Sequence, residues 1–182
     1  MGKVQIIGGT YRSRVINFSD EFKNLRPTPN RVRQTLFNWL ENDLTNKVCL
    51  DAYAGSGALG FDAVSLGAKQ VVMLEKNPTI CKQLIANRAL LKIDNLQIIN
   101  TDAINYMKSS SGCFDLIFLD PPYHSDLLIQ TLELIKLQRI LKPDGLIYVE
   151  YDKIPALLGY QIIKQKKAAS VGFGLIKLEE VK

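Results

Sequence analysis

From residue 48 onward, short apolar runs alternate with segments of helical periodicity. The apolar runs span residues 48–53, 70–77, 96–100, 115–120 and 146–151. Strands that are apolar along their whole length are buried on both faces, and parallel strands need helical crossovers between them. The pattern therefore predicts an α/β fold, with a mostly parallel sheet and helices on both faces. One of these helices is expected to end at Leu66 before Gly67, and another to cover roughly residues 126–141.

The two ends of the chain have different patterns. Residues 3–18 read as a hairpin that turns at Gly8 and Gly9. Thr28 is expected to cap the following helix, with Pro29 in its first turn. Residues 160–168 and 173–180 are expected to form an antiparallel pair at the sheet edge. We accordingly divide the chain into an N-terminal extension, residues 1–46, and an α/β domain, residues 47–182.

Charge is distributed unevenly along the chain. The net charge of the 182 residues is +5, but residues 48–152 carry nine basic and twelve acidic side chains. Residues 1–40 carry seven basic side chains and two acids, and residues 153–182 carry six and two. Basic flanks around an acidic centre indicate a polyanionic partner at the ends. A solvated basic surface explains the same numbers equally well.

Several other classes of protein are disfavoured by composition. No apolar run has the length of a membrane span or a signal peptide, so we expect a cytoplasmic protein. The three cysteines lie far apart and His124 is the single histidine, expected on a surface loop. Neither a disulfide framework nor a metal site is therefore predicted.

A glycine-rich loop follows the first apolar run. Gly55, Gly57 and Gly60 have G-x-G-x-x-G spacing, and Glu75 closes the next apolar run twenty residues after Gly55. In dinucleotide-binding proteins such glycines let the backbone approach the cofactor, and the carboxylate binds ribose hydroxyls. The loop predicts a nucleoside-containing cofactor.

The identity of this cofactor depends on the neighbouring acids. Asp51 stands immediately before the loop, where a nicotinamide dinucleotide would place its pyrophosphate. A carboxylate there suits S-adenosylmethionine better, because that cofactor carries a sulfonium and an ammonium. Asp102 follows the third apolar run and either accepts from an adenine amine or caps the next helix.

The fourth apolar run ends in Asp120, Pro121, Pro122 and Tyr123. Proline cannot donate to a β-ladder and its φ angle is fixed, so the strand must stop at Asp120 and continue as a stiff loop. Rigid loops at strand ends hold functional groups in α/β proteins.

The segments LDAYAGSGALG, LEKN, NTDA and DPPY resemble, in order and spacing, the S-adenosylmethionine-dependent methyltransferases, and DPPY is similar to the signature of those that methylate nucleobase amines. Together with GTYRSR, LRPTPNRVRQTLFNWL and LKPDGLIYVE, they resemble the RsmD family of bacterial 16S ribosomal RNA guanine-N2 methyltransferases. The resemblance covers roughly residues 4–151 and is weak in the last thirty residues. It implies a Rossmann-like class I fold with a seven-stranded sheet and an antiparallel C-terminal strand.

The resemblance also implies roles for individual residues. Catalysis is assigned to Asp120, Pro121, Pro122 and Tyr123. Cofactor binding is assigned to Asp51, Ala54, Gly55, Gly57, Glu75, Lys76, Asp102, Ala103 and Asp120. RNA binding in the extension is assigned to Arg12, Arg14, Arg26, Arg31 and Arg33. The implied partner is 16S ribosomal RNA, in an assembling or assembled small subunit, with the protein acting as a monomer in the cytoplasm.

The chemistry of a nucleobase amine agrees with these roles. Its lone pair is delocalised into the ring, so two acceptors that hold its N–H bonds out of plane would favour attack. Asp120 and the carbonyl of Pro121 can accept these bonds, and Tyr123 can stack on the base. Three alternatives stay open: an adenine-N6 or cytosine-N4 methyltransferase acting on DNA or other RNA, a nicotinamide-dependent oxidoreductase, and a non-catalytic RNA-binding protein.

Overall fold

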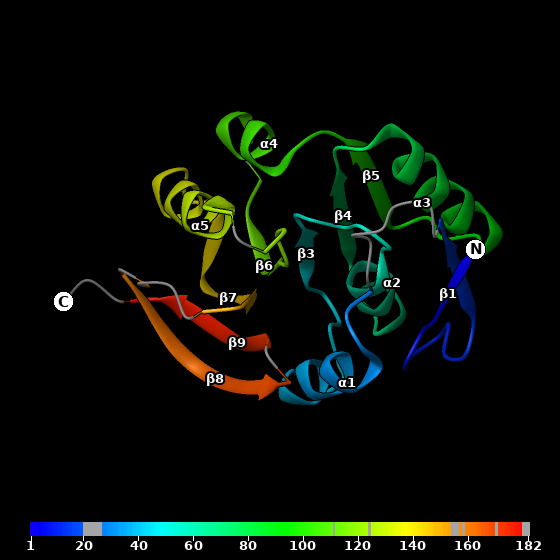
Figure 1. Ribbon diagram of the computed structural model, residues 1–182, viewed down its shortest axis with the longest axis horizontal. Coiled ribbons are helices and arrows are strands. Elements are labelled where there is room, and N and C mark those ends of the chain that lie inside the picture. Colours follow the sequence, from blue (N-terminus) through cyan, green and yellow to red (C-terminus); the bar gives the residue numbers. More distant parts are fainter. Residues whose placement is uncertain are drawn as a thin grey trace.

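The computed structural model describes residues 1–19, 27–110, 112–123, 125–153, 157, 159–169 and 171–179 of the 182. Two sheets are present in this part of the chain. The smaller is an antiparallel hairpin of β1 (Gly2–Gln5) and β2 (Val15–Phe18). The larger has seven strands in the order β5-β4-β3-β6-β7-β9-β8 and runs through the middle of the molecule (Figure 1).

The large sheet is parallel except at one strand. The strands β3 to β7 run parallel to one another, and β9 is antiparallel to both of its neighbours, β7 and β8. The bounds are β3 (Val48–Asp51), β4 (Gln70–Glu75), β5 (Leu96–Asn100), β6 (Phe114–Leu119), β7 (Leu141–Tyr151), β8 (Tyr160–Ala168) and β9 (Val171–Leu178). The expected seven-stranded, mostly parallel sheet is confirmed.

Helices cover both faces of this sheet. Buried side chains of α1 (Asn30–Trp39), α2 (Ala58–Ser65) and α3 (Pro78–Leu90) share one core cluster. Those of α4 (Ala103–Ser109) and α5 (Leu127–Leu137) share the other. Figure 1 shows α4 and α5 together, away from α1, α2 and α3. In the described part of the chain, none of these helices has the length and apolar character needed to cross a membrane.

The N-terminal extension packs into the same core as the sheet. Val4, Ile6 and Ile16 of the hairpin are buried in the cluster that contains α2 and α3. The turn approaches α2 closely, because Thr10 N donates to Ser65 O at 2.8 Å. Gly9 has φ +71°, and a Cβ atom there would lie 1.7 Å from Ser65 O, so this contact requires glycine.

Two local expectations are wrong. The helix expected to reach residue 141 ends at Leu137, because Ile140 O accepts from Phe114 N at 2.8 Å and Leu141 pairs with Phe114 in the sheet. Thr28 does not cap α1: the helix begins at Asn30, and Pro29 occupies the cap position without a side-chain hydrogen bond. The hydroxyl of Thr28 instead contacts the loop after β6, as described below.

Candidate active site

The carboxyl ends of five parallel strands place several acids at one edge of the sheet. The chain leaves β3 toward β4 on one side, whereas β6 pairs with β3 on the other side. Asp51 is in register with Phe118, so the glycine loop after β3 and the proline loop after β6 start next to each other. Ligands bind at such points in open α/β sheets, where the connections diverge.

The glycine loop is held by the two carboxylates on either side of it. Gly55 N donates to Glu75 Oε2 at 3.1 Å, and Gly60 N, in the first turn of α2, donates to Asp51 Oδ2 at 3.1 Å. Glu75 Oε1 also accepts from Asn77 N at 2.8 Å. A Cβ atom at Gly60 would lie 2.2 Å from Met73 Cε, so the approach of α2 to the sheet requires glycine here.

These hydrogen bonds distinguish between the two cofactors that fit the glycine spacing. A dinucleotide needs free N–H groups at the start of the helix for its pyrophosphate. Here Asp51 occupies the N–H of Gly60, and its negative charge would repel a phosphate. A cofactor with a sulfonium and an ammonium suits a carboxylate at this position. The donor set therefore fits S-adenosylmethionine and does not fit a nicotinamide dinucleotide.

The loop after β6 carries the predicted catalytic residues. Asp120 directly follows the buried Leu119 and is itself partly exposed. Pro121 is buried, Pro122 is exposed, and 44% of the Tyr123 surface is exposed. The ring of Tyr123 is thus available to a planar ligand, while its hydroxyl donates to Glu150 Oε2 at 3.5 Å. Ser125 Oγ donates to Pro122 O at 2.6 Å and fastens the end of the loop.

Two residues at this site had no predicted role in catalysis or binding. Leu119 pairs with Val149, so the next residue of β7, Glu150, lies beside Asp120. Glu150 is 4% exposed and accepts from Tyr148 Oη at 2.8 Å. Thr28, just before α1, donates from Oγ1 to Asp120 Oδ2 at 3.4 Å. Both residues occur in segments that carry the resemblance, LKPDGLIYVE and LRPTPNRVRQTLFNWL, but only the strand pairing and the hydrogen bond in the folded protein show that they lie beside Asp120.

The result is a cluster of three acids without a basic partner among the described residues. Burial raises the pKa of Asp51 to about 7. Burial, and then the charges of Glu150 and Asp51, raise the pKa of Asp120 well above its ordinary value. Burial also raises the pKa of Glu150. Like charges close together cannot all ionise easily, so Asp120 holds a proton more readily than a free aspartate does.

The remaining residues that were predicted to bind the cofactor lie along the same edge. Asp102 accepts from Asn105 N at 2.8 Å and therefore caps α4. Helix capping was one of the two roles expected for this residue. Ala103 is buried beneath it in the first turn. Lys76 follows β4, and its carbonyl accepts from Asn100 Nδ2 at 3.1 Å. Ala54, in the glycine loop, donates from its N–H to Leu74 O at 3.0 Å.

One of the predicted RNA-binding residues is not available to RNA. Arg33 is fully buried and forms an ion pair with Asp62 of α2. Its other donors reach Thr28 O at 3.0 Å and Gln5 O at 3.1 Å. The guanidinium thus joins the hairpin, the segment before α1, and α2. The prediction that Arg33 contacts RNA is wrong. Helical periodicity places Arg33 with Val32, Leu36 and Phe37 on the buried face of α1.

The other arginines of the extension occupy two separate places. Arg31 is exposed at the start of α1, three residues after Thr28 in the sequence. Arg12 and Arg14 are exposed on the hairpin, at the opposite end of α2 from the glycine loop. Arg26 and His124 lie outside the described residues.

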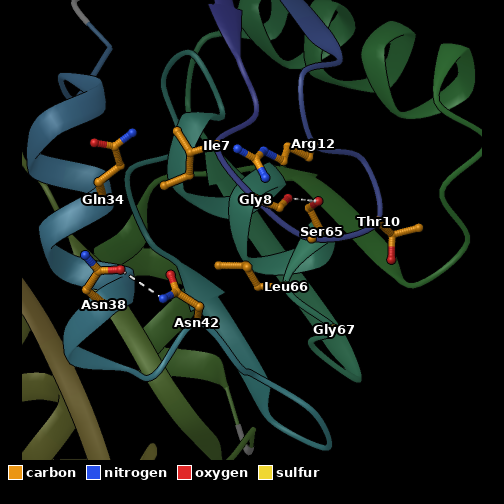
Figure 2. Close-up of a pocket in the computed structure, with 11 residues that line it drawn as sticks. Ile7, Gly8, Thr10, Arg12, Gln34, Asn38, Asn42, Ser65, Leu66 and Gly67 are labelled. Atoms are coloured by element: carbon orange, nitrogen blue, oxygen red, sulfur yellow. Dashed lines mark hydrogen bonds between the residues drawn. The ribbon is translucent and has the colours of Figure 1, made fainter.

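Arg12 borders a shallow pocket of about 610 Å³ between the hairpin turn, α1 and the end of α2 (Figure 2). Its walls are mostly polar and include Gln34, Asn38 and Asn42. Ser65 donates to Gly8 O and stabilises the turn that forms one wall. This pocket lies away from the acids at the strand ends, so it is separate from the candidate active site.

The fold and the site together define a Rossmann-like methyltransferase that depends on S-adenosylmethionine. The chain belongs to the family described as Conserved hypothetical protein 95, which matches residues 4–177. It is 39% identical over 181 residues to the Ribosomal RNA small subunit methyltransferase D of Haemophilus influenzae, covering 96% of this chain and 93% of that protein.

Two further similarities extend over nearly the whole chain. The Escherichia coli K12 protein of the same name is 36% identical over 184 residues, covering 98% of this chain and 91% of that protein. The solved structure of the Escherichia coli protein yhhF superposes with a TM-score of 0.88 at 36% identity, covering 98% of this chain and 99% of that one. The resemblance in the sequence is thereby confirmed at the level of the family, and the similarity includes the C-terminal strands.

Proposed function

We propose that this protein transfers a methyl group from S-adenosylmethionine to the exocyclic N2 amine of a guanine in 16S ribosomal RNA. The observation that carries the proposal is the position of Asp120: it ends β6 beside the glycine loop and begins a proline-stiffened loop with a half-exposed aromatic ring. The names of the relatives support ribosomal RNA as the substrate class. The same names support the small subunit as its source.

In this proposal the protein acts mainly by holding the amine. Asp120 accepts one N–H and the carbonyl of Pro121 accepts the other, so that the nitrogen lone pair leaves the plane of the base. Tyr123 stacks on the base and fixes its plane. The locked φ angles of Pro121 and Pro122 keep these groups in place before the substrate arrives. Positioning of this kind can supply up to ~7–11 kcal/mol of the barrier.

When bound, S-adenosylmethionine supplies an electrophilic methyl group on its sulfonium. The amine nitrogen forms a bond to the methyl carbon while the carbon–sulfur bond breaks, and the nitrogen then carries a surplus proton. Asp120 accepts this proton, for which its raised pKa makes it more suitable than an ordinary aspartate. Asp120 must be ionised first, so we expect turnover to rise with pH through its pKa.

The target base must leave its stack to reach Tyr123. This step is easiest in a single-stranded loop of RNA, where neighbouring bases hold it least. We further propose that the RNA is presented by an assembling or assembled small subunit and that the protein acts as a monomer. The extension, residues 1–46, would then contact the RNA, and residues 47–182 would perform the transfer.

The proposal is tested with tritiated S-adenosylmethionine and three substrates: small subunits from a strain that lacks the enzyme, naked ribosomal RNA, and DNA. We expect label in N2-methylguanine of the ribosomal substrates alone. Label in adenine or cytosine, or in DNA, would contradict the guanine assignment. A nicotinamide dinucleotide that binds while S-adenosylmethionine does not would contradict the methyltransferase.

Asp120→Ala tests the catalytic assignment. We expect turnover to fall by about 10³-fold or more, because both the orienting acceptor and the proton acceptor are lost. Affinity for S-adenosylhomocysteine, measured by calorimetry, should change by no more than a few-fold. Asp126→Ala is the matched control, because Asp126 is an exposed acid on the same loop without a capping bond. Wild-type turnover in Asp120→Ala would end the role proposed for this carboxylate.

A further inference from the structure

The outermost strand of the large sheet, β8, has an unusual surface. All seven residues from 161 to 167 are exposed, so that neither face of this stretch is covered (Figure 1). Three of them, Lys164, Lys166 and Lys167, are basic, and none is acidic. Within the described residues no ion pair engages these lysines. The strand therefore presents a row of free positive charges.

The register of the sheet aligns this row with the active site. Glu150 pairs with Phe173 of β9, and Phe173 pairs with Lys166 of β8. In the same way Tyr148 and Lys164 both pair with Leu175. Directly paired residues project to the same face of a sheet, so Lys164 and Lys166 share a face with Glu150. With two strand spacings between them, the Cα atoms of Glu150 and Lys166 lie about 10 Å apart.

Lysine on an edge strand also prevents the strand from pairing with another chain. That role does not require the charges to lie at one end of the strand. In β8 the charges gather at the end near the active site, while the other end exposes Ile162 and Ile163, 39% and 40% exposed. The position of the lysines thus follows the active site and not the length of the unpaired edge.

The lysines share a face of the sheet with Glu150 and carry the opposite charge to the acids of the active site. A nucleic acid backbone that crossed this edge of the sheet near Glu150 would meet the positive charges of Lys164 and Lys166. The acids themselves would repel phosphate, so the backbone would be held at the lysines while the target base reached Asp120.

We infer that the end of β8 is a phosphate-binding surface for the RNA, in which Lys164 and Lys166 contact the backbone on one side of the target nucleotide. This inference rests on the proposed function and adds a contact from the C-terminal strand pair to those of the extension. The lysines act on affinity and register, because phosphate contacts position a nucleic acid without reading its bases.

The test compares two double variants with equal changes in charge. Lys164→Gln/Lys166→Gln removes two charges from β8, and Lys69→Gln/Lys108→Gln removes two exposed lysines elsewhere, one just before β4 and one in the last turn of α4. Affinity for a ribosomal RNA fragment is measured against salt concentration. Each lost contact to single-stranded RNA reduces the slope of log K against log salt by ~0.7, so we expect a reduction of ~1.4 for the β8 variant.

The control variant should keep the wild-type slope, and Lys164→Arg/Lys166→Arg should keep both slope and affinity. Binding of S-adenosylhomocysteine should be unchanged in all variants, which also shows that they are folded. An unchanged slope in the β8 glutamine variant, or an equal loss in the control, would overturn the inference. If wild type methylated no RNA, the proposed function would fail instead, whatever the slopes.

Discussion

Two groups of charged side chains in this protein, most of them buried, differ in whether their charges are paired. Arg33 and Asp62 form a pair beneath the hairpin, in which the guanidinium also donates to backbone carbonyls and Asp62 accepts from Ile7 N at 3.0 Å. Asp51, Asp120 and Glu150 form a cluster at the strand ends, with no cation beside them among the described residues. The first group is neutral as a whole, and the second is not.

The difference separates structure from function. A paired and fully bonded charge holds three segments of chain together and leaves nothing for a ligand to bind. Acids without a nearby cation destabilise the protein when no ligand is bound. Groups of this kind are found where a bound ligand supplies the missing charge. Burial raises the pKa of Asp62 to about 6, while the charge of Arg33 opposes this, so the pair is ionised at neutral pH.

The largest expected effect comes from breaking the neutral pair. Arg33→Met leaves Asp62 buried without its cation, and we expect a loss of about 3–5 kcal/mol in the free energy of unfolding, measured with urea. Arg33→Met/Asp62→Leu should recover much of this loss, because both charges are then absent. A stable Arg33→Met variant with a reduced salt slope for RNA binding would return Arg33 to the RNA interface.

A smaller effect of opposite sign is expected in the acidic cluster. The folded protein binds more protons than the unfolded chain where the pKa of Asp51 is raised from its ordinary value to about 7. Stability contributed by protonated Asp51 is therefore present below about pH 4 and is lost as the pH rises to about 7. Asp51→Asn should be more stable than wild type at pH 8, by roughly 1–3 kcal/mol.

The advantage of Asp51→Asn should vanish near pH 4, and its affinity for S-adenosylhomocysteine should be greatly reduced. Denaturation curves recorded from pH 4 to pH 8 would show this convergence. If the variant were less stable than wild type throughout the range, the hydrogen bonds accepted by Asp51 would outweigh its burial, and the contrast between the two groups would be lost.

The smallest effect is expected for a third pair, which lies nearer to solvent. Lys142 Nζ lies 2.8 Å from Asp115 Oδ2, with the two side chains 39% and 16% exposed. Pairs of this kind contribute little, so Lys142→Met should cost less than about 1 kcal/mol in the same urea experiment. A loss as large as that of Arg33→Met would show that burial is not what distinguishes the pairs.

The main features of the fold were predictable because they depend on local patterns. The strand Leu96–Asn100 occurs where the alternation of apolar segments placed it, and Tyr160–Ala168 occurs where a strand of the antiparallel edge pair was expected. The positions of the glycine loop and of Asp120 followed in the same way, since both are set by residues that end a strand. Hydrophobic periodicity and turn residues act over a few positions and can be read directly from the chain.

The errors concern contacts between distant segments. The sequence around Arg33 does not show that its ion-pair partner is Asp62. Nor does the sequence show that Thr28 donates to Asp120 instead of capping α1. Glu150 was missed because a single acid in an apolar strand has no local signature, and its role depends on the neighbouring β6. Such contacts are set by tertiary packing, so local sequence patterns do not predict them.

The hydrogen bond from Thr28 to Asp120 bears on how deletion experiments should be interpreted. A shortened protein that began after this threonine would lose the hairpin and its arginines, and it would also lose a hydrogen-bond donor to the carboxylate that we propose acts in catalysis. Slower turnover in such a truncation could therefore result either from weaker RNA binding or from a changed pKa of Asp120. Single substitutions that leave the backbone of the first thirty residues whole are needed to separate the two.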